Sequence, residues 1–110
     1  MRLHNLPFEQ IKAGKKCVEI RLFDEKRQQI QEGDNLIFVN IQSGEMLRCI
    51  VRKLAQFPDF TALYEAYESK ALGYEEGEKV DPADMLQYYT IEEVKAYGTL
   101  AIELLLLDKS

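Results

Sequence analysis

Apolar and polar residues alternate along several short stretches of the chain, which is the pattern of β-strands with one buried face. The predicted strands are residues 17–23, 36–39, 46–54 and 99–107. In the first of them, Val18, Ile20 and Leu22 share one face, and because all three are apolar we expect that face to enter the core. Residues 36–39 are apolar at every position, so this strand is predicted to be buried on both faces.

Helical spacing of apolar residues, together with capping signals, predicts four short helical segments. They are residues 7–13, a helix that begins after Asp59, a helix that opens at Pro82, and a helix from residue 91 to Tyr97. The capping signals are Asn5 before Pro7, Asp59, Asp81 before Pro82, and the capping box formed by Thr90 and Glu93. Gly14 and Gly98 each follow one of these helices, where a left-handed residue commonly ends a helix.

The elements follow one another as a short helix, three strands, a helical insertion and one last strand. Because the first strands adjoin through turns at Gly33–Asp34 and Ser43–Gly44, the sheet is predicted to be antiparallel and curled into a small barrel. The predicted fold class is therefore α+β, with the helices packed on one side of the barrel. The 110 residues, of which 46% are hydrophobic and 30% charged, fit a single domain spanning 1–110.

The chain is acidic, with a net charge of −5, but the two signs are unevenly distributed. Residues 1–60 hold ten Lys and Arg against eight Asp and Glu, whereas residues 61–110 hold four against eleven. Nonspecific binding to duplex nucleic acid needs many contacts between basic side chains and phosphates, and this balance does not favour it. A pocket for one nucleotide or a short single strand is compatible with it, because only the local potential matters there.

The cysteine and histidine content argues against a metal site. Cys17 and Cys49 stand alone without a CxxC pair, and His4 is the single histidine, so the sequence offers no set of zinc ligands. We expect two buried or half-buried free thiols and no cofactor. The start of the chain lacks the apolar stretch of a signal peptide, and the longest apolar run, Leu104–Leu107, is too short to span a bilayer. A cytoplasmic location is expected.

The candidate chemistry lies on the strand predicted at residues 17–23. Lys16 stands at its entrance, and Glu19 and Arg21 share its second face with Cys17. Two cations and one carboxylate this close together suit a ligand that carries polar and anionic groups. A charged strand face that is merely exposed to solvent is the alternative interpretation, since such faces are common.

The chain contains the spacing Gly-x-Lys-x-x-Glu-x-Arg. It is formed by Gly14, Lys16, Glu19 and Arg21. This motif, the turn at residues 33–34 and the Tyr97–Gly98 pair before the last strand resemble the ASCH domain family, named for homology to the activating signal cointegrator. The resemblance covers essentially the whole chain. It implies a PUA-like β-barrel with helices beside it, and a cleft in which Lys16, Glu19 and Arg21 bind RNA or a nucleotide.

The same resemblance implies an alternative function as an enzyme. One branch of small ASCH proteins, similar to this chain in length, hydrolyses the acetyl amide of N4-acetylcytidine with a Lys, a Thr nucleophile and a Glu. By position Lys16 matches that Lys, and Glu19 stands where the Thr would be. Lys16 and Glu19 would then be the catalytic residues of an amidohydrolase of N4-acylated cytidine or a related modified nucleoside, with Glu19 as general base. The candidates for a third carboxylate are Glu75, Glu76, Glu78 and Asp84.

A nucleotide-binding function also calls for aromatic platforms on which bases stack. The candidates are Phe38, Tyr88, Tyr89 and Tyr97, although aromatic residues at helical spacing more commonly pack in a core. A second basic group, formed by Arg48, Arg52 and Lys53, is more typical of a solvated strand edge. The second alternative function is a protein-interaction module that docks a basic partner through the acidic residues 65–84. RNA or nucleotide binding is the favoured function, and the sequence leaves the oligomeric state open.

Overall fold

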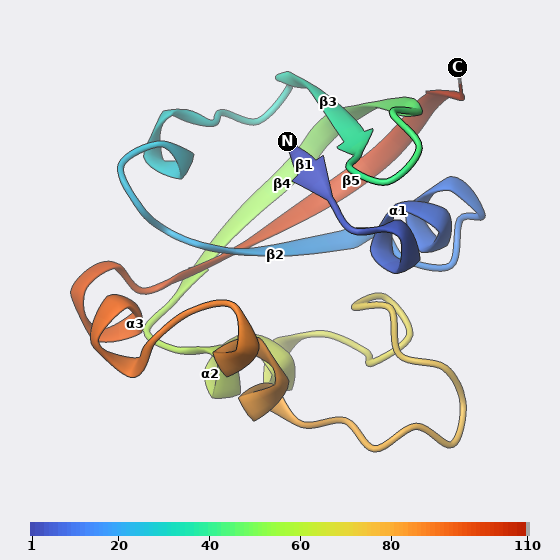
Figure 1. Ribbon diagram of the computed structural model, residues 1–110. Helices are drawn as coiled ribbons and strands as arrows, with labels where there is room; N and C mark the ends of the chain where they lie inside the picture. Colours follow the sequence, from blue (N-terminus) through green and yellow to red (C-terminus); the bar gives the residue numbers. More distant parts are fainter. Residues whose placement is uncertain (110) are drawn as a thin grey trace.

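The computed structural model describes residues 1–109 and contains one five-stranded sheet. Its strands are β1 (Arg2–Leu3), β2 (Val18–Leu22), β3 (Asn35–Asn40), β4 (Met46–Phe57) and β5 (Thr99–Lys109), in the order β1-β3-β4-β5-β2. The sheet curls into a half-barrel whose middle is crossed by the long strands β4 and β5 (Figure 1). Neighbouring strands are antiparallel, except that β1 and β3 are parallel.

Five short helical segments complete the fold. They are α1 (Asn5–Lys12), η1 (Arg27–Gln29), α2 (Phe60–Ala66), η2 (Pro82–Gln87) and α3 (Ile91–Tyr97), of which η1 and η2 are 3-10 helices. The segment from α2 to α3 lies below the sheet in the view of Figure 1, and α1 lies at the end of the half-barrel near β2 (Figure 1). Within residues 1–109, no helix combines the length and the apolar character that crossing a membrane requires.

Alternation along β2 and β5 sends side chains into two separate cores. In the antiparallel register Glu19 lies opposite Ile102 and Ile20 lies opposite Ala101, and paired residues project from the same face. Ile102 belongs to the first core, which α1 covers with Phe8, whereas Ile20 and Ala101 belong to the second core, beneath α2 and α3. Strand β2 is therefore covered on both faces, and Glu19 projects from the face of the first core.

All of the predicted helix signals except the Asn5 cap are present. Asp59 and Asp81 each accept a backbone N–H as the N-cap of α2 and η2. The Thr90–Glu93 capping box is complete at the start of α3, because both of its hydrogen bonds form. Gly14 and Gly98 follow α1 and α3 with φ of +78° and +73°, a conformation that favours glycine. These caps and glycines define where the helices begin and end.

Three features of the fold differ from the prediction. The sheet is not wholly antiparallel, because β1 pairs in parallel with β3; two residues are too few for a periodic pattern to reveal. The helices are not all on one side, since α1 covers one core and α2 and α3 cover the other. Residues 36–39 are not buried on both faces, and Ile37 is 49% exposed, because α1 and the first core cover only the other face of β3.

Two predictions at the start of the chain also need correction. The first helix begins at Asn5 rather than Pro7, and the Asn5 side chain does not cap it but accepts a hydrogen bond from Asn40 Nδ2 at 3.0 Å. Cys17 is exposed rather than buried or half-buried, because it precedes β2 instead of lying within it. Cys49 is a buried free thiol, as predicted, and burial raises its pKa to about 11.

Candidate functional site

The N-terminal end of β2 is held by two other segments. After α1 the chain turns at Gly14, and the Lys16 amide donates to the Gln10 carbonyl at 3.1 Å. The amides of Cys17 and Val18 both donate to the carbonyl of Ala71, in the connection between α2 and η2, at 3.1 Å each. The strand entrance, and with it Lys16, is thereby fixed between α1 and the helical insertion.

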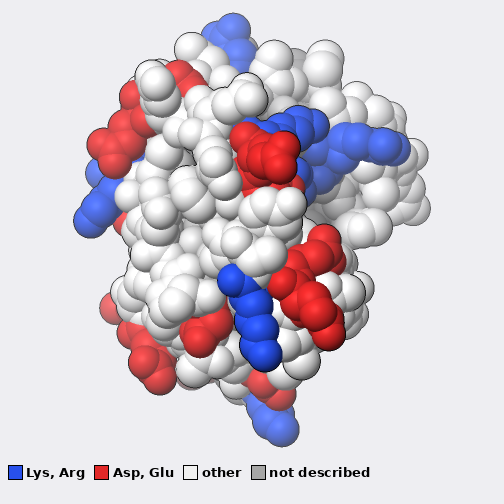
Figure 2. All heavy atoms as spheres, turned by 90° about the vertical axis from the view of Figure 1, so that its left-hand side faces the viewer, with Lys and Arg blue, Asp and Glu red and all other residues white. Residues whose placement is uncertain are grey.

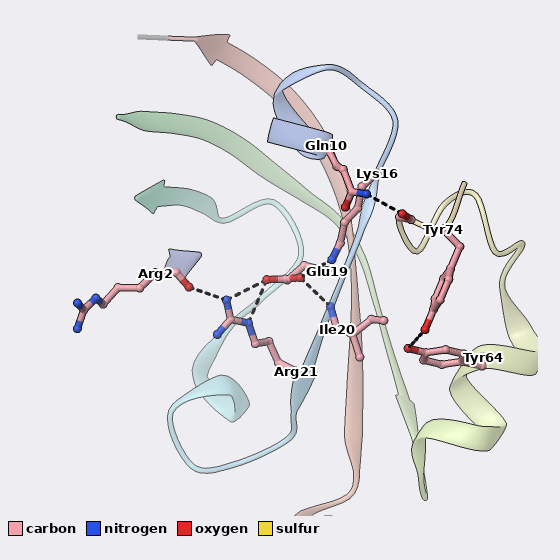
Figure 3. Close-up of polar contacts among 9 residues, drawn as sticks. Arg2, Gln10, Lys16, Glu19, Ile20, Arg21, Tyr64 and Tyr74 are labelled. Carbon is pink, nitrogen blue, oxygen red and sulfur yellow. Dashed lines mark hydrogen bonds and ion pairs between the residues drawn. The ribbon is translucent and has the colours of Figure 1, made fainter. Parts of the chain in front are cut away.

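The predicted trio of Lys16, Glu19 and Arg21 comes together around the Glu19 carboxylate (Figure 3). Lys16 Nζ lies 3.1 Å from Glu19 Oε1, and the Ile20 amide donates to the same oxygen at 3.2 Å. Arg21 donates to Glu19 Oε2 through Nε at 3.1 Å and through Nη2 at 2.9 Å. Nη2 also donates to the Arg2 carbonyl at 3.0 Å, which links β2 to β1 across the site.

The trio is nearly withdrawn from solvent. The side chains of Lys16, Glu19 and Arg21 are 10%, 5% and 14% exposed. Burial by itself would raise the pKa of Glu19, but the charges and hydrogen bonds of Lys16 and Arg21 outweigh it and hold the pKa below its ordinary value. Glu19 is therefore an ionised carboxylate at neutral pH, and the three side chains together carry one net positive charge.

Hydrogen-bond capacity divides the roles within the trio. Each Glu19 oxygen already accepts from two N–H donors, which uses the lone pairs of the carboxylate. Lys16 Nζ pairs only with Glu19 among the described residues, and Arg21 Nη1 has no hydrogen-bond partner within residues 1–109. The N–H groups left over belong to the two cations. The arrangement is suited to binding an anion or another strong acceptor.

These cations line a cleft of about 470 Å³ between the sheet and the helical insertion. One wall is formed by β1, α1 and β2. The facing wall carries Tyr64 and Tyr74, and their hydroxyls lie 3.0 Å apart (Figure 3). Tyr74 donates to Asp84 Oδ2 at 2.7 Å. Burial and the hydrogen bonds to Tyr64 and Asp84 raise the pKa of Tyr74, so its hydroxyl stays protonated and holds this wall together.

Gly73 joins the two walls. Its carbonyl accepts from Gln10 Nε2 at 2.7 Å, so the insertion is tied to α1 beside Lys16 (Figure 3). The residue has a φ of +101°, and a Cβ placed there would lie 2.9 Å from Gln10 Oε1 and 3.1 Å from Lys16 Cδ. The backbone conformation therefore calls for glycine at this position, and a side chain there would also displace Gln10 and Lys16.

The other sequence candidates divide between the cleft and the rest of the molecule. Tyr88, Tyr89, Glu78 and Asp84 line the cleft together with the trio. Phe38 is a fully buried core residue, and Tyr97, Glu75 and Glu76 do not line the cleft. Arg48, Arg52 and Lys53 are exposed on β4 and do not line it either. Within residues 1–109, no group of three or more His, Cys, Asp and Glu side chains is placed to hold a metal ion.

Sequence reasoning missed the polar groups of the facing wall and of α1. Gln10, Tyr64 and Tyr74 come from three separate segments, so no spacing rule relates them to Lys16. The one local signal was Gly73, because glycine is the usual residue where the chain must adopt a left-handed conformation.

The chain forms a small α+β half-barrel around one five-stranded sheet. The buried ionic trio and the cleft lie beside β2, an edge strand of this sheet. The chain belongs to the ASCH domain family, which it matches over residues 1–108.

Two solved structures are similar to this chain over nearly its full length. The crystal structure of the hypothetical protein PH0355 has 34% sequence identity and a TM-score of 0.82, and the match covers 97% of this chain and 96% of that chain. The solution NMR structure of protein PF0455 from Pyrococcus furiosus has 26% identity and a TM-score of 0.71, covering 98% and 99%. A comparison with curated proteins found no match. The similar structures therefore support the fold without adding an activity.

The first prediction concerns the Glu19 carboxylate. Glu19→Gln should lower the free energy of unfolding by about 3 kcal/mol at pH 7, because it leaves two nearly buried cations without their counter-charge. The folded-state pKa of Glu19 is lowered, so its contribution is full above about pH 4.3, the value of an unfolded Glu, and is lost as the pH falls through the folded pKa. The difference in the free energy of unfolding between wild type and Glu19→Gln should therefore become smaller in acid. Urea unfolding between pH 7 and pH 3 measures it.

Glu45→Gln is the matched control. Glu45 also pairs with a lysine, Lys12, at 2.6 Å, but the two side chains are 25% and 34% exposed. Loss of the Glu45 charge should change the free energy of unfolding far less than loss of the Glu19 charge, since solvent screens ion pairs that are this exposed. Equal losses for the two variants at pH 7, or a Glu19→Gln effect that does not vary with pH, would contradict a buried ionised Glu19.

Proposed function

We propose that the cleft binds a nucleotide or a short single strand of RNA, with a phosphate held by Lys16 and Arg21. The observation that carries this proposal is the pair of cations whose remaining N–H groups, on Lys16 Nζ and Arg21 Nη1, have no partner within residues 1–109. Both residues line the cleft, and their side chains are fixed by Glu19. Because the cations are already ordered and partly desolvated, little further ordering is needed when an anion binds.

The size of the cleft and the charge of the trio support the same ligand class. Its volume of about 470 Å³ lies in the range of roughly 300–1,000 Å³ that is typical of small-molecule sites. The trio is locally cationic in a chain whose net charge is −5. A single buried phosphate responds to that local potential, whereas a long duplex would meet the acidic surface as well.

Binding accounts for the Glu19 environment better than catalysis does. A general base needs a free lone pair and a pKa near the working pH, but both Glu19 oxygens accept two hydrogen bonds and its pKa is lowered. We infer that Glu19 positions Lys16 and Arg21 and does not attack water. The amidohydrolase alternative would need another carboxylate of the cleft; of the other two, Asp84 accepts a hydrogen bond from Tyr74 and Glu78 accepts one from the Glu75 amide.

Family membership points in the same direction. The resemblance to ASCH proteins implies RNA or nucleotide binding beside the signature strand, and it is the basis on which we assign the half-barrel to the PUA-like class. Docking of a basic protein partner through the acidic residues 65–84 stays the second alternative function. Figure 2 shows Lys and Arg side chains interspersed with Asp and Glu on the face in view.

The second prediction tests the cations. Lys16→Met keeps the apolar stem and removes the ammonium group, so it should weaken binding of nucleoside 5′-monophosphates roughly 10- to 100-fold, the equivalent of one charged hydrogen bond. Isothermal titration calorimetry at low salt with the four common monophosphates measures the affinity.

Arg52→Ala serves as the control for loss of a positive charge, because Arg52 is exposed on β4 and does not line the cleft. It should leave the affinity unchanged. Equal binding by Lys16→Met and wild type, or no binding of any nucleotide by wild type, would overturn the proposal. The same protein is incubated with N4-acetylcytidine, and its consumption would favour the amidohydrolase instead.

The third prediction compares two glycines. Gly73→Ala should weaken nucleotide binding more than Gly77→Ala does. Both residues have positive φ, +101° and +86°, so each alanine introduces backbone strain. Only at position 73 would the new Cβ meet Gln10 and Lys16; nothing lies within 4 Å of it at position 77. Calorimetric titration of both variants with the same nucleotide is the measurement, and equal affinities would show that Gly73 does not position Lys16.

A further inference from the structure

Two aromatic rings from distant parts of the chain lie near each other at the cleft. His4 lies between β1 and α1, and Tyr88 follows η2 on the facing wall. Their ring centroids are 6.2 Å apart, and the ring planes are tilted by 33°. Both residues line the same cleft as Lys16 and Arg21.

His4 and Tyr88 differ from the other aromatic residues of the cleft, which pack against a buried ring or form hydrogen bonds. Tyr88 is 59% exposed and His4 is also exposed, and neither side chain has a hydrogen-bond partner among residues 1–109. By contrast, Tyr89 stacks on the buried ring of Phe60 at 5.9 Å, and the Tyr74 hydroxyl is bound by its neighbours. Packing thus explains Tyr89 and Tyr74, whereas it leaves the faces of His4 and Tyr88 open to a ligand.

The spacing of the two rings is close to that of an aromatic sandwich. Optimal contact between carbon atoms is at about 3.5 Å, so a planar base between two parallel rings needs them about 7 Å apart. The observed 6.2 Å is short of this by less than one ångström. An outward movement of one ring that also brings the two ring planes parallel and face to face would admit a base.

We propose that His4 and Tyr88 sandwich the planar base of the ligand while Lys16 and Arg21 hold its anionic group. This inference rests on the proposed nucleotide-binding function and adds the groups that recognise the base. Leu6, which is 67% exposed, adds an apolar surface to the same cleft. Stacking of this kind recognises an aromatic ring without distinguishing strongly among bases, because every base has a π-face.

The test separates the base from the phosphate. Wild type, His4→Ala, Tyr88→Ala and Lys16→Met are titrated with a nucleoside 5′-monophosphate and with ribose 5-phosphate, which lacks the base. His4→Ala and Tyr88→Ala should each weaken nucleotide binding about tenfold and leave ribose 5-phosphate binding unchanged. Lys16→Met should weaken both. Tyr88→Phe, which keeps the ring, should bind like wild type, and so should Tyr97→Ala, which removes an aromatic residue outside the cleft.

A second readout does not depend on the phosphate. His4 is the only histidine in the chain, so the proton on its ring carbon between the two nitrogens gives one resolved histidine resonance. Adenosine, which carries no phosphate, should shift this resonance in wild type, and ribose 5-phosphate should not. The Tyr88→Ala variant should show a smaller shift.

The outcomes distinguish the two proposals. If His4→Ala and Tyr88→Ala bind the nucleotide as tightly as wild type while Lys16→Met does not, the sandwich is overturned and the proposed function stands. If wild type binds neither the nucleotide nor ribose 5-phosphate, the proposed function fails. In that case a His4 shift with adenosine would still support the sandwich, and its absence would overturn it.

Discussion

The site depends on one buried carboxylate. Glu19 holds the Lys16 ammonium and the Arg21 guanidinium within 3.1 Å of its oxygens, in surroundings from which water is nearly excluded. Two cations placed this close without it would repel each other and would be poorly solvated. The Glu19 carboxylate therefore allows two ordered positive charges to lie at the edge of an apolar core. Through Arg21 and the Arg2 carbonyl, it also connects the two strands at opposite ends of the sheet order.

The fold provides this arrangement through strand geometry. Strand β2 has a core on each face, and alternation sends Ile20 into one and Glu19 toward the other. A charged residue can be buried there only because its partners come from the same short segment, two or three residues away. The facing wall is held by a separate set of hydrogen bonds among Tyr64, Tyr74 and Asp84. Each side of the cleft is therefore ordered independently, and Gly73 and Gln10 join them.

The part of the site that the sequence could predict is the local part. Lys16, Glu19 and Arg21 lie within six residues, so the period of two of a strand was sufficient to place Glu19 and Arg21 on one face. Helix caps such as Asp59 were predictable for the same reason. The rest depends on contacts between distant segments. The parallel β1–β3 pair, the opposing wall and the exposure of Ile37 follow from tertiary packing, which has no periodic signal in one sequence.

The central claim about function is our proposal that the cations of the trio bind a small anion or a single strand in preference to a long duplex. The most direct test is a titration of the ¹⁵N-labelled protein with nucleoside 5′-monophosphates, followed by amide chemical shifts. The account predicts saturable shifts that are largest for the amides of Ile20, Arg21 and Gly73, around the trio. Shifts concentrated instead at the exposed basic residues of β4, such as Arg52 and Lys53, or no shifts at millimolar nucleotide, would contradict it.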